Sequence, residues 1–124
     1  MTNNPILVVD DDGPILGLMR SLLKEFGFEC VTAESGERAL VAAQARPPAL
    51  VLLDKNMPGM LIDEVIRGLR AQDGLAQVPI LILSGELLSR SELRELGADG
   101  AVQKPFDIPA LIDQIRAHLG LVGT

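Results

Sequence analysis

Five short apolar runs alternate along the chain with segments of helical periodicity, and this alternation restricts the fold more than any other feature. The apolar runs predict strands at residues 6–9, 29–33, 49–53, 80–83 and 100–103. Apolar residues at helical spacing predict helices over about 14–26, 36–45, 61–71, 91–96 and 109–119. Alternating strands and helices with short connections are typical of a parallel sheet covered by helices on both faces. The sequence therefore predicts a doubly wound α/β domain.

The inward faces of the helices are predicted from apolar residues three or four positions apart. The predicted inward face of the first helix consists of Ile15, Leu18, Met19, Leu22, Leu23 and Phe26. Leu61 and Ile62, at the start of the third helix, are expected to pack in the core, with an exposed partner-binding patch as the alternative. Asp107 is expected to cap the last helix.

The length, net charge and cysteine content of the chain narrow the class of protein to which it can belong. The 124 residues are expected to form one domain, 1–124, with a core at about 5–119. A net charge of −6 argues against direct binding to nucleic acid, which needs a basic face. Cys30 is the only cysteine, so it is interpreted as a buried structural thiol. Because no apolar stretch reaches the length of a membrane span and no signal peptide is recognised, a cytoplasmic protein is predicted.

Polar side chains follow the predicted strands at the points where those strands end. Ligands of such sheets bind outside the carboxyl ends of the strands, so these side chains are expected to converge on one edge. The residues are Asp10, Asp11 and Asp12 after the first strand, Asp54 after the third, Ser84 after the fourth and Lys104 after the fifth. Asp12 is interpreted as a charge at a helix start rather than as a ligand.

Three carboxylates at one edge need a compensating charge. At about 5 Å, each pair repels by roughly 3 kcal/mol at an effective dielectric of 20. A bound divalent cation or the ammonium group of Lys104 would relieve the repulsion, and both remain open. Mg²⁺ fits hard oxygen ligands, with Mn²⁺ as an alternative ion. Zinc is disfavoured, because the single histidine, His118, lies far along the last helix.

The same arrangement prepares one aspartate for attack on phosphorus. A carboxylate can form an acyl phosphate, and the incoming group needs a cation, a lysine and a hydroxyl around its oxygens. Asp54 is central in the chain and in the predicted sheet, so it is the best candidate nucleophile. Ser84 would supply the hydroxyl group.

Four motifs, VVDDD, LLDKNMPGM, ILILSGE and VQKPF, occur in this order and resemble the receiver domain of two-component response regulators. The resemblance runs from about residue 5 to residue 119. It implies a flavodoxin-like (βα)5 fold with strand order 2-1-3-4-5. It also implies a phosphoacceptor domain that takes a phosphoryl group from a histidine kinase or a histidine phosphotransfer protein and then switches its output surface. Such a domain is not a turnover enzyme.

The resemblance also assigns roles to individual residues. Asp54 would be phosphorylated, and Mg²⁺ would be held by Asp10, Asp11, the side chain of Asp54 and the backbone carbonyl of Asn56. Asn56 would in addition tune the hydrolysis of the acyl phosphate.

Three further residues complete the implied site. Ser84 would correspond to the switch serine or threonine of the family. Lys104 would correspond to its invariant lysine, ahead of a cis peptide to Pro105. Glu86 would tune hydrolysis together with Asn56.

The sequence departs from the family pattern at three places. Ala101 replaces the usual aromatic residue on the last strand, and Leu61 and Ile62 stand where the family commonly has Asp-Gly. Residues 85–99 are fewer than expected, which predicts a reduced fourth helix. These departures leave the output surface open.

Two alternatives to phosphoacceptance remain open from the sequence, and several partners are undefined. One alternative is a receiver-like docking module that is not phosphorylated. The other is a phosphatase similar to the haloacid dehalogenase group, with Asp10 as its nucleophile. The downstream protein partner is undefined, and a homodimer is an open alternative.

Overall fold

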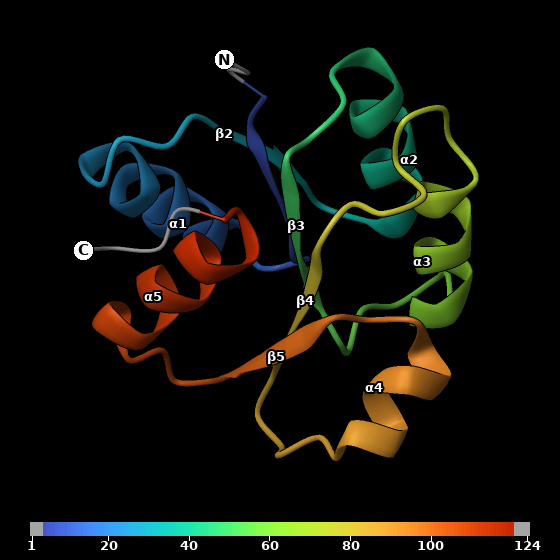
Figure 1. Ribbon diagram of the computed structural model, residues 1–124. Coiled ribbons are helices and arrows are strands. Elements are labelled where there is room, and N and C mark those ends of the chain that lie inside the picture. The colour runs from blue at the N-terminus through green and yellow to red at the C-terminus, as the bar shows by residue number, and fades with distance from the viewer. Residues whose placement is uncertain (1–3, 121–124) are drawn as a thin grey trace.

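The computed structural model describes residues 4–120, which form one parallel sheet covered by helices. The strands are β1 (Ile6–Val9), β2 (Cys30–Ala33), β3 (Leu50–Asp54), β4 (Ile80–Ser84) and β5 (Gly100–Gln103). Their order across the sheet is β2-β1-β3-β4-β5, and every neighbouring pair is parallel (Figure 1). The predicted fold and strand order are confirmed.

Helices cover both faces of the sheet. They are α1 (Gly13–Glu25), α2 (Gly36–Ala45), α3 (Ile62–Arg70), α4 (Arg90–Leu96) and α5 (Ile108–His118). Helices α1 and α5 pack on one face, whereas α2 and α3 pack on the other (Figure 1). The order reverses at β1, because the chain passes from β1 through α1 to β2 on one side of it and then returns through α2 to β3 on its other side. This switch point places the end of β1 beside the end of β3.

The central strand shows why the strands read as unbroken apolar runs. Leu50 and Leu52 contribute to the core layer under α1 and α5, whereas Val51 and Leu53 contribute to the layer under α2 and α3. All four side chains are fully buried. A strand that is buried on both faces needs apolar residues at every position. The charged residue that follows, Asp54, therefore marks the edge of the core.

The first helix begins and ends where its sequence predicts. The carboxylate of Asp12 accepts a hydrogen bond of 3.3 Å from the backbone N–H of Ile15, so Asp12 serves as the N-cap of α1. Pro14 lies in the first turn, where its missing N–H is not needed. Gly27 follows the helix with a φ of 87°, a left-handed conformation that favours glycine.

Three apolar residues predicted to pack in the core, Leu18, Phe26 and Leu61, are exposed instead. Phe26 is 39% exposed because it lies at the C-cap, after the last turn of α1. The buried stripe of α1 is Leu16, Met19 and Leu23, and Leu18 is 61% exposed because one residue along a helix turns its side chain by about 100°. Leu61 is 66% exposed, because it precedes α3 in an extended conformation that turns it to solvent. Ile62 does pack partly against the core.

Asp107 occupies the N-cap position of α5, as predicted, but its side chain accepts no cap hydrogen bond. The predicted position is therefore correct and the predicted capping bond is wrong. Pro109 in the first turn removes one of the backbone donors that a cap would otherwise serve.

The fourth helix is reduced, as predicted. Helix α4 has seven residues, none of them buried. Its N-terminus is closed by a capping box between Ser89 and Glu92, with bonds of 2.9 and 3.1 Å. Its C-terminal end is tied to the rest of the protein by Arg70, whose guanidinium donates to the carbonyl of Gly97 and to the carboxylate of Asp99. Helix α4 is therefore fixed more firmly at its C-terminal end.

Cys30 and His118 are both intermediate in burial. Cys30 is partly rather than fully buried, and burial raises the pKa of its thiol to about 11. His118 is also only partly exposed, and its Nδ1 lies 2.9 Å from the carbonyl oxygen of Gln114. Among residues 4–120, no helix is long and apolar enough to cross a membrane.

Replacing Gly36 by alanine is expected to destabilise the fold by about 1–3 kcal/mol, because the core there has no room for a methyl group. A Cβ at this position would lie 2.5 Å from Cγ2 of Val65 and 3.3 Å from Cβ of Met60. Urea unfolding would measure the loss. The matched control is Gly17→Ala inside α1, where nothing lies within 4 Å. That change is expected to stabilise by roughly 0.5–1 kcal/mol, and an equal effect at both sites would contradict the prediction.

Candidate functional site

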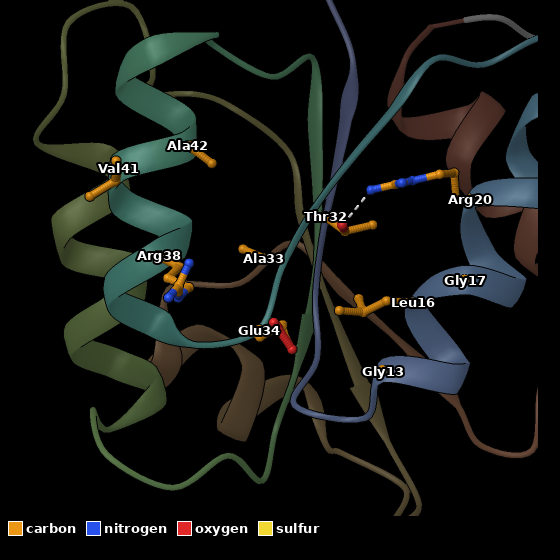
Figure 2. Close-up of a pocket in the computed structure, with 10 residues that line it drawn as sticks. All are labelled: Gly13, Leu16, Gly17, Arg20, Thr32, Ala33, Glu34, Arg38, Val41 and Ala42. Carbon is orange, nitrogen blue, oxygen red and sulfur yellow. Dashed lines mark hydrogen bonds between the residues drawn. The ribbon is translucent and has the colours of Figure 1, made fainter.

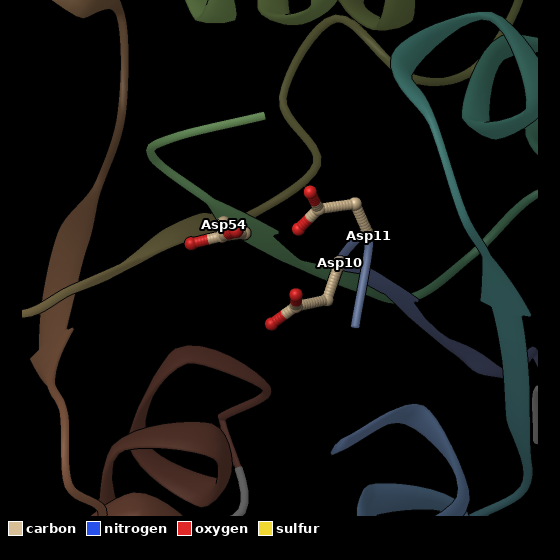
Figure 3. A group of neighbouring side chains, drawn as sticks. All are labelled: Asp10, Asp11 and Asp54. Carbon is tan, nitrogen blue, oxygen red and sulfur yellow. The ribbon is translucent and has the colours of Figure 1, made fainter. Parts of the chain in front are cut away.

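Three carboxylates meet at the carboxyl edge of the sheet. Residues Val9 and Leu53 are paired in the β1–β3 register, so Asp10 and Asp54, the next residues along, lie side by side. One oxygen each from Asp10, Asp11 and Asp54 can be chosen so that all three lie within 4.8 Å of one another. Figure 3 shows Asp10 and Asp11 on the segment after β1 and Asp54 at the end of β3. The predicted convergence is present.

The three carboxylates differ in exposure and in hydrogen bonding. Asp10 is 1% exposed and Asp54 is 6% exposed, whereas Asp11 faces solvent. Oδ1 of Asp10 accepts a bond of 3.0 Å from the backbone N–H of Asp12. Asp10 is therefore held in one orientation, and Asp11 is the member of the group that is open to solvent.

Lys104 joins the two buried carboxylates. Its Nζ donates to Oδ2 of Asp10 at 3.1 Å and to Oδ1 of Asp54 at 3.2 Å. The backbone N–H of Lys104 donates to the carbonyl oxygen of Ser84 at 2.7 Å, which fixes the lysine beside the end of β4. The peptide bond from Lys104 to Pro105 is cis. The residues that follow three different strands are thus linked through one ammonium group.

Burial and charge shift the pKa values of this pair. Burial is the largest cause that raises the pKa of Asp54 above its usual value near 3.8, and the charge of Asp10 adds to the rise. The hydrogen bond from Lys104 opposes it, as does a backbone hydrogen bond from Asn56. Burial alone would lower the pKa of Lys104, but its bonds to Asp10 and Asp54 raise it above the usual 10.5. The site therefore carries more negative charge than its one lysine relieves.

A pH dependence of stability follows from the raised pKa of Asp54. Because the folded state binds this proton more tightly than the unfolded state, the contribution is fully present below pH 3.8 and is lost as the pH rises through the raised pKa. In EDTA, we therefore expect the protein to lose stability relative to Asp54→Asn as the pH rises from below 3.8 through the raised pKa of Asp54. Urea unfolding of both proteins across this range would measure the difference, and a difference independent of pH would contradict the prediction.

The loop after β4 carries the other predicted residues. Ser84 is buried, and its Oγ accepts a bond of 3.0 Å from the backbone N–H of Glu86. The hydroxyl hydrogen of Ser84 is therefore left free to be donated elsewhere. Asn56 is exposed two residues after Asp54.

One contact near the site was not predicted. The Nζ of Lys55 lies 3.1 Å from Oε1 of Glu86, so an ion pair joins the loop after β3 to the loop after β4. The sequence suggested a role for Glu86 only, through the family resemblance. The lysine directly after Asp54 indicates that an ion pair could form near the site, but nothing in the sequence shows with which carboxylate it pairs.

The chemistry of the donor set fits a small divalent cation. Asp10, Asp11 and Asp54 offer hard carboxylate oxygens, the ligand type that Mg²⁺ prefers. Among residues 4–120, no other group of three or more His, Cys, Asp or Glu side chains meets the same geometry. The acidic group is thus capable of binding a metal ion.

A separate hollow of about 650 Å³ lies along the edge strand β2, between α1 and α2 (Figure 2). In it, Arg20 donates a bond of 2.7 Å to the hydroxyl of Thr32. None of the three clustered aspartates lines this hollow. It is therefore distinct from the acidic site.

The fold and the acidic edge define a class of protein: a doubly wound α/β domain with a charged site at its topological switch point. A family model described as the response regulator receiver domain matches residues 6–116. The chain belongs to this family. It is therefore a receiver domain of the kind found in two-component signalling, a family that does not consist of turnover enzymes. The alternative of a phosphatase similar to the haloacid dehalogenases is therefore wrong.

Two curated relatives illustrate the similarity. Sporulation initiation phosphotransferase F of Bacillus subtilis is 36% identical over 121 residues, which cover 98% of this chain and 98% of that protein. The phosphate regulon transcriptional regulatory protein PhoB of Pseudomonas aeruginosa is 34% identical over 125 residues, or 99% of this chain. The chain spans only about half the length of PhoB, 55%.

A solved structure shows the same fold. It is the receiver domain of the sensor histidine kinase PA1611 from Pseudomonas aeruginosa, described with a magnesium ion coordinated in its active-site cleft. Its TM-score against this protein is 0.81 at 22% identity, covering 94% of this chain and 98% of that one. This likeness concerns the fold.

Proposed function

We propose that Asp54 is the phosphoacceptor of this receiver domain and that it receives its phosphoryl group from a phosphohistidine donor. One observation carries the proposal: the buried carboxylate of Asp54 lies at the carboxyl edge of the sheet, 3.2 Å from the ammonium of Lys104, within the group of three aspartates. A nucleophile, a cation and a second charged group are thus already in place for phosphoryl transfer.

The reaction can be written with this chain's own groups. A carboxylate oxygen of Asp54 attacks phosphorus, and the bond from phosphorus to the donor's histidine nitrogen breaks, leaving its electron pair on nitrogen. Lys104 then stabilises the negative oxygens of the transferred group, and the hydroxyl of Ser84 donates to one of them. The departing nitrogen takes up a proton from solvent, so the products are an aspartyl phosphate and a neutral histidine.

A divalent cation completes the proposed site. Asp10, Asp11 and the side chain of Asp54 would hold Mg²⁺, or alternatively Mn²⁺, together with the backbone carbonyl of Asn56. When bound, the ion neutralises charge on the phosphoryl oxygens and relieves the repulsion among the carboxylates. Glu86 and Asn56 are proposed to tune the hydrolysis of the aspartyl phosphate.

Membership of the family implies a histidine kinase or a phosphotransfer protein as the donor. The similarity to a sporulation phosphotransferase over nearly its whole length supports a place in a phosphorelay, in the cytoplasm. Ala101 stands on β5 at the position where the family usually has an aromatic residue, and it packs partly against the core layer under α2 and α3. Residues other than that aromatic residue must therefore transmit the effect of phosphorylation to the output surface.

The test is to incubate the protein with acetyl phosphate and Mg²⁺, and to locate the modification by mass spectrometry. One phosphoryl group per chain, on Asp54 and absent when EDTA replaces Mg²⁺, is the expected result. Phosphate on another residue would overturn the proposal. If neither acetyl phosphate nor a phosphohistidine donor labels the protein, the alternative of a docking module that is not phosphorylated is correct.

A further inference from the structure

The ion pair between Lys55 and Glu86 joins the two loops that border the phosphorylation site. Lys55 follows Asp54 directly, and its backbone N–H donates to the carbonyl of Leu83 at 2.9 Å. Glu86 lies two residues after Ser84, and its own N–H is bonded to the Ser84 hydroxyl. Since β3 and β4 are neighbours in the sheet, the contact between Lys55 and Glu86 connects the loops that follow these two strands at the carboxyl edge.

The two members of the pair differ in exposure. The side chain of Lys55 is 26% exposed and that of Glu86 is 69% exposed. Lys55 is therefore the better fixed partner, and it determines where the more exposed carboxylate of Glu86 lies. Glu92 is a second carboxylate that feels the charge of Lys55, but it is already engaged in the capping box with Ser89.

We propose that Lys55 is a positioning residue that lengthens the life of the aspartyl phosphate. By holding Glu86, it keeps the loop after β4 against the loop after β3 and limits the approach of water to the phosphoryl group. This inference rests on the proposed phosphorylation of Asp54.

The step that the pair restrains is hydrolysis. Water attacks phosphorus, the bond from phosphorus to the carboxylate oxygen of Asp54 breaks with its electrons on that oxygen, and the proton of the water passes to solvent. The products are inorganic phosphate and free Asp54. The attacking water must approach from the side opposite the breaking bond, so an obstacle at the open edge of the site slows it.

An exposed pair of this kind contributes little to folding stability. Its loss should therefore alter the lifetime of the phosphorylated state and leave the folded protein intact. This separates the proposed role from a purely structural one, which would change stability first.

The experiment measures the half-life of the aspartyl phosphate after the donor has been removed by desalting, in the presence of Mg²⁺. Lys55→Met and Glu86→Gln are each expected to shorten the half-life by about 2- to 5-fold, the range set by the coupling of exposed ion pairs. Lys55→Arg, which keeps the charge, is expected to retain most of the wild-type half-life. In the double variant Lys55→Glu with Glu86→Lys, the half-life of the aspartyl phosphate should be longer than in either single variant.

The control removes another surface ion pair of this protein. Arg67 and Asp63 lie 3.6 Å apart on α3, and Arg67→Met is expected to leave the half-life unchanged. A half-life that Lys55→Met does not shorten, or that Lys55→Arg fails to retain, would overturn the inference while phosphorylation of Asp54 stands. A wild-type protein that takes no label at all would overturn the proposed function, and the inference with it.

Discussion

Asp54→Asn is expected to take up no phosphoryl group from acetyl phosphate and Mg²⁺, under conditions in which the wild-type protein is labelled. The amide lacks the negative oxygen that attacks phosphorus. Asp10, the other buried carboxylate that contacts Lys104, follows β1 and does not end the central strand, as Asp54 does. Intact-mass spectrometry of the two proteins, side by side, would measure the loss.

The loss of labelling in Asp54→Asn is expected to come from the missing nucleophile and not from unfolding. Because burial and the charge of Asp10 oppose ionisation of Asp54, the asparagine variant is expected to be more stable than the wild type in EDTA. Asp10→Asn is the matched control: it removes one charge from the same cluster but should keep a reduced level of labelling. Full labelling of Asp54→Asn would show that the phosphoacceptor lies elsewhere.

Lys104→Met is expected to slow phosphorylation from acetyl phosphate by about 100-fold, the usual effect of removing one donor to developing negative charge. Lys104 is the cation that contacts both Asp10 and Asp54, so no neighbouring side chain replaces it. Stopped labelling reactions, analysed by mass at increasing times, would give the rate.

The same variant should bind Mg²⁺ more tightly than the wild type. The ammonium repels a dication, and without it the two buried carboxylates are compensated only by the metal ion. Titration calorimetry would measure the affinity, and Arg116→Met at the far end of α5 serves as a charge-matched control. A phosphorylation rate near that of the wild type would rule out the role given to Lys104.

The fold was predictable because the signals for it are local. The three inner strands β1, β3 and β4 are buried on both faces, so a run such as Leu50 to Leu53 stands out without knowledge of its neighbours. The convergence of Asp10 and Asp54 was also predictable, since parallel strands deliver their carboxyl ends to a common edge. The roles of these residues in phosphorylation remain predictions.

Details that depend on the exact phase of a helix or on long side chains were not predictable. Leu18 fits helical spacing with its apolar neighbours, yet packing centres the buried stripe on Leu16 and Met19. Leu61 is exposed because the loop before α3 turns it outward. The contact of Lys55 with Glu86 spans 31 residues and depends on how two loops are placed, which the sequence does not encode locally.

The attachment of α4 has a consequence for how such chains diversify. None of its seven residues is buried, and its C-terminal end is tied down by Arg70 through Gly97 and Asp99. Substitutions on the outward surface of this helix therefore leave the sheet and the acidic edge untouched. The segment can accumulate changes that favour a new binding partner while the acidic edge is inherited intact, so partner specificity and the acidic site can evolve separately.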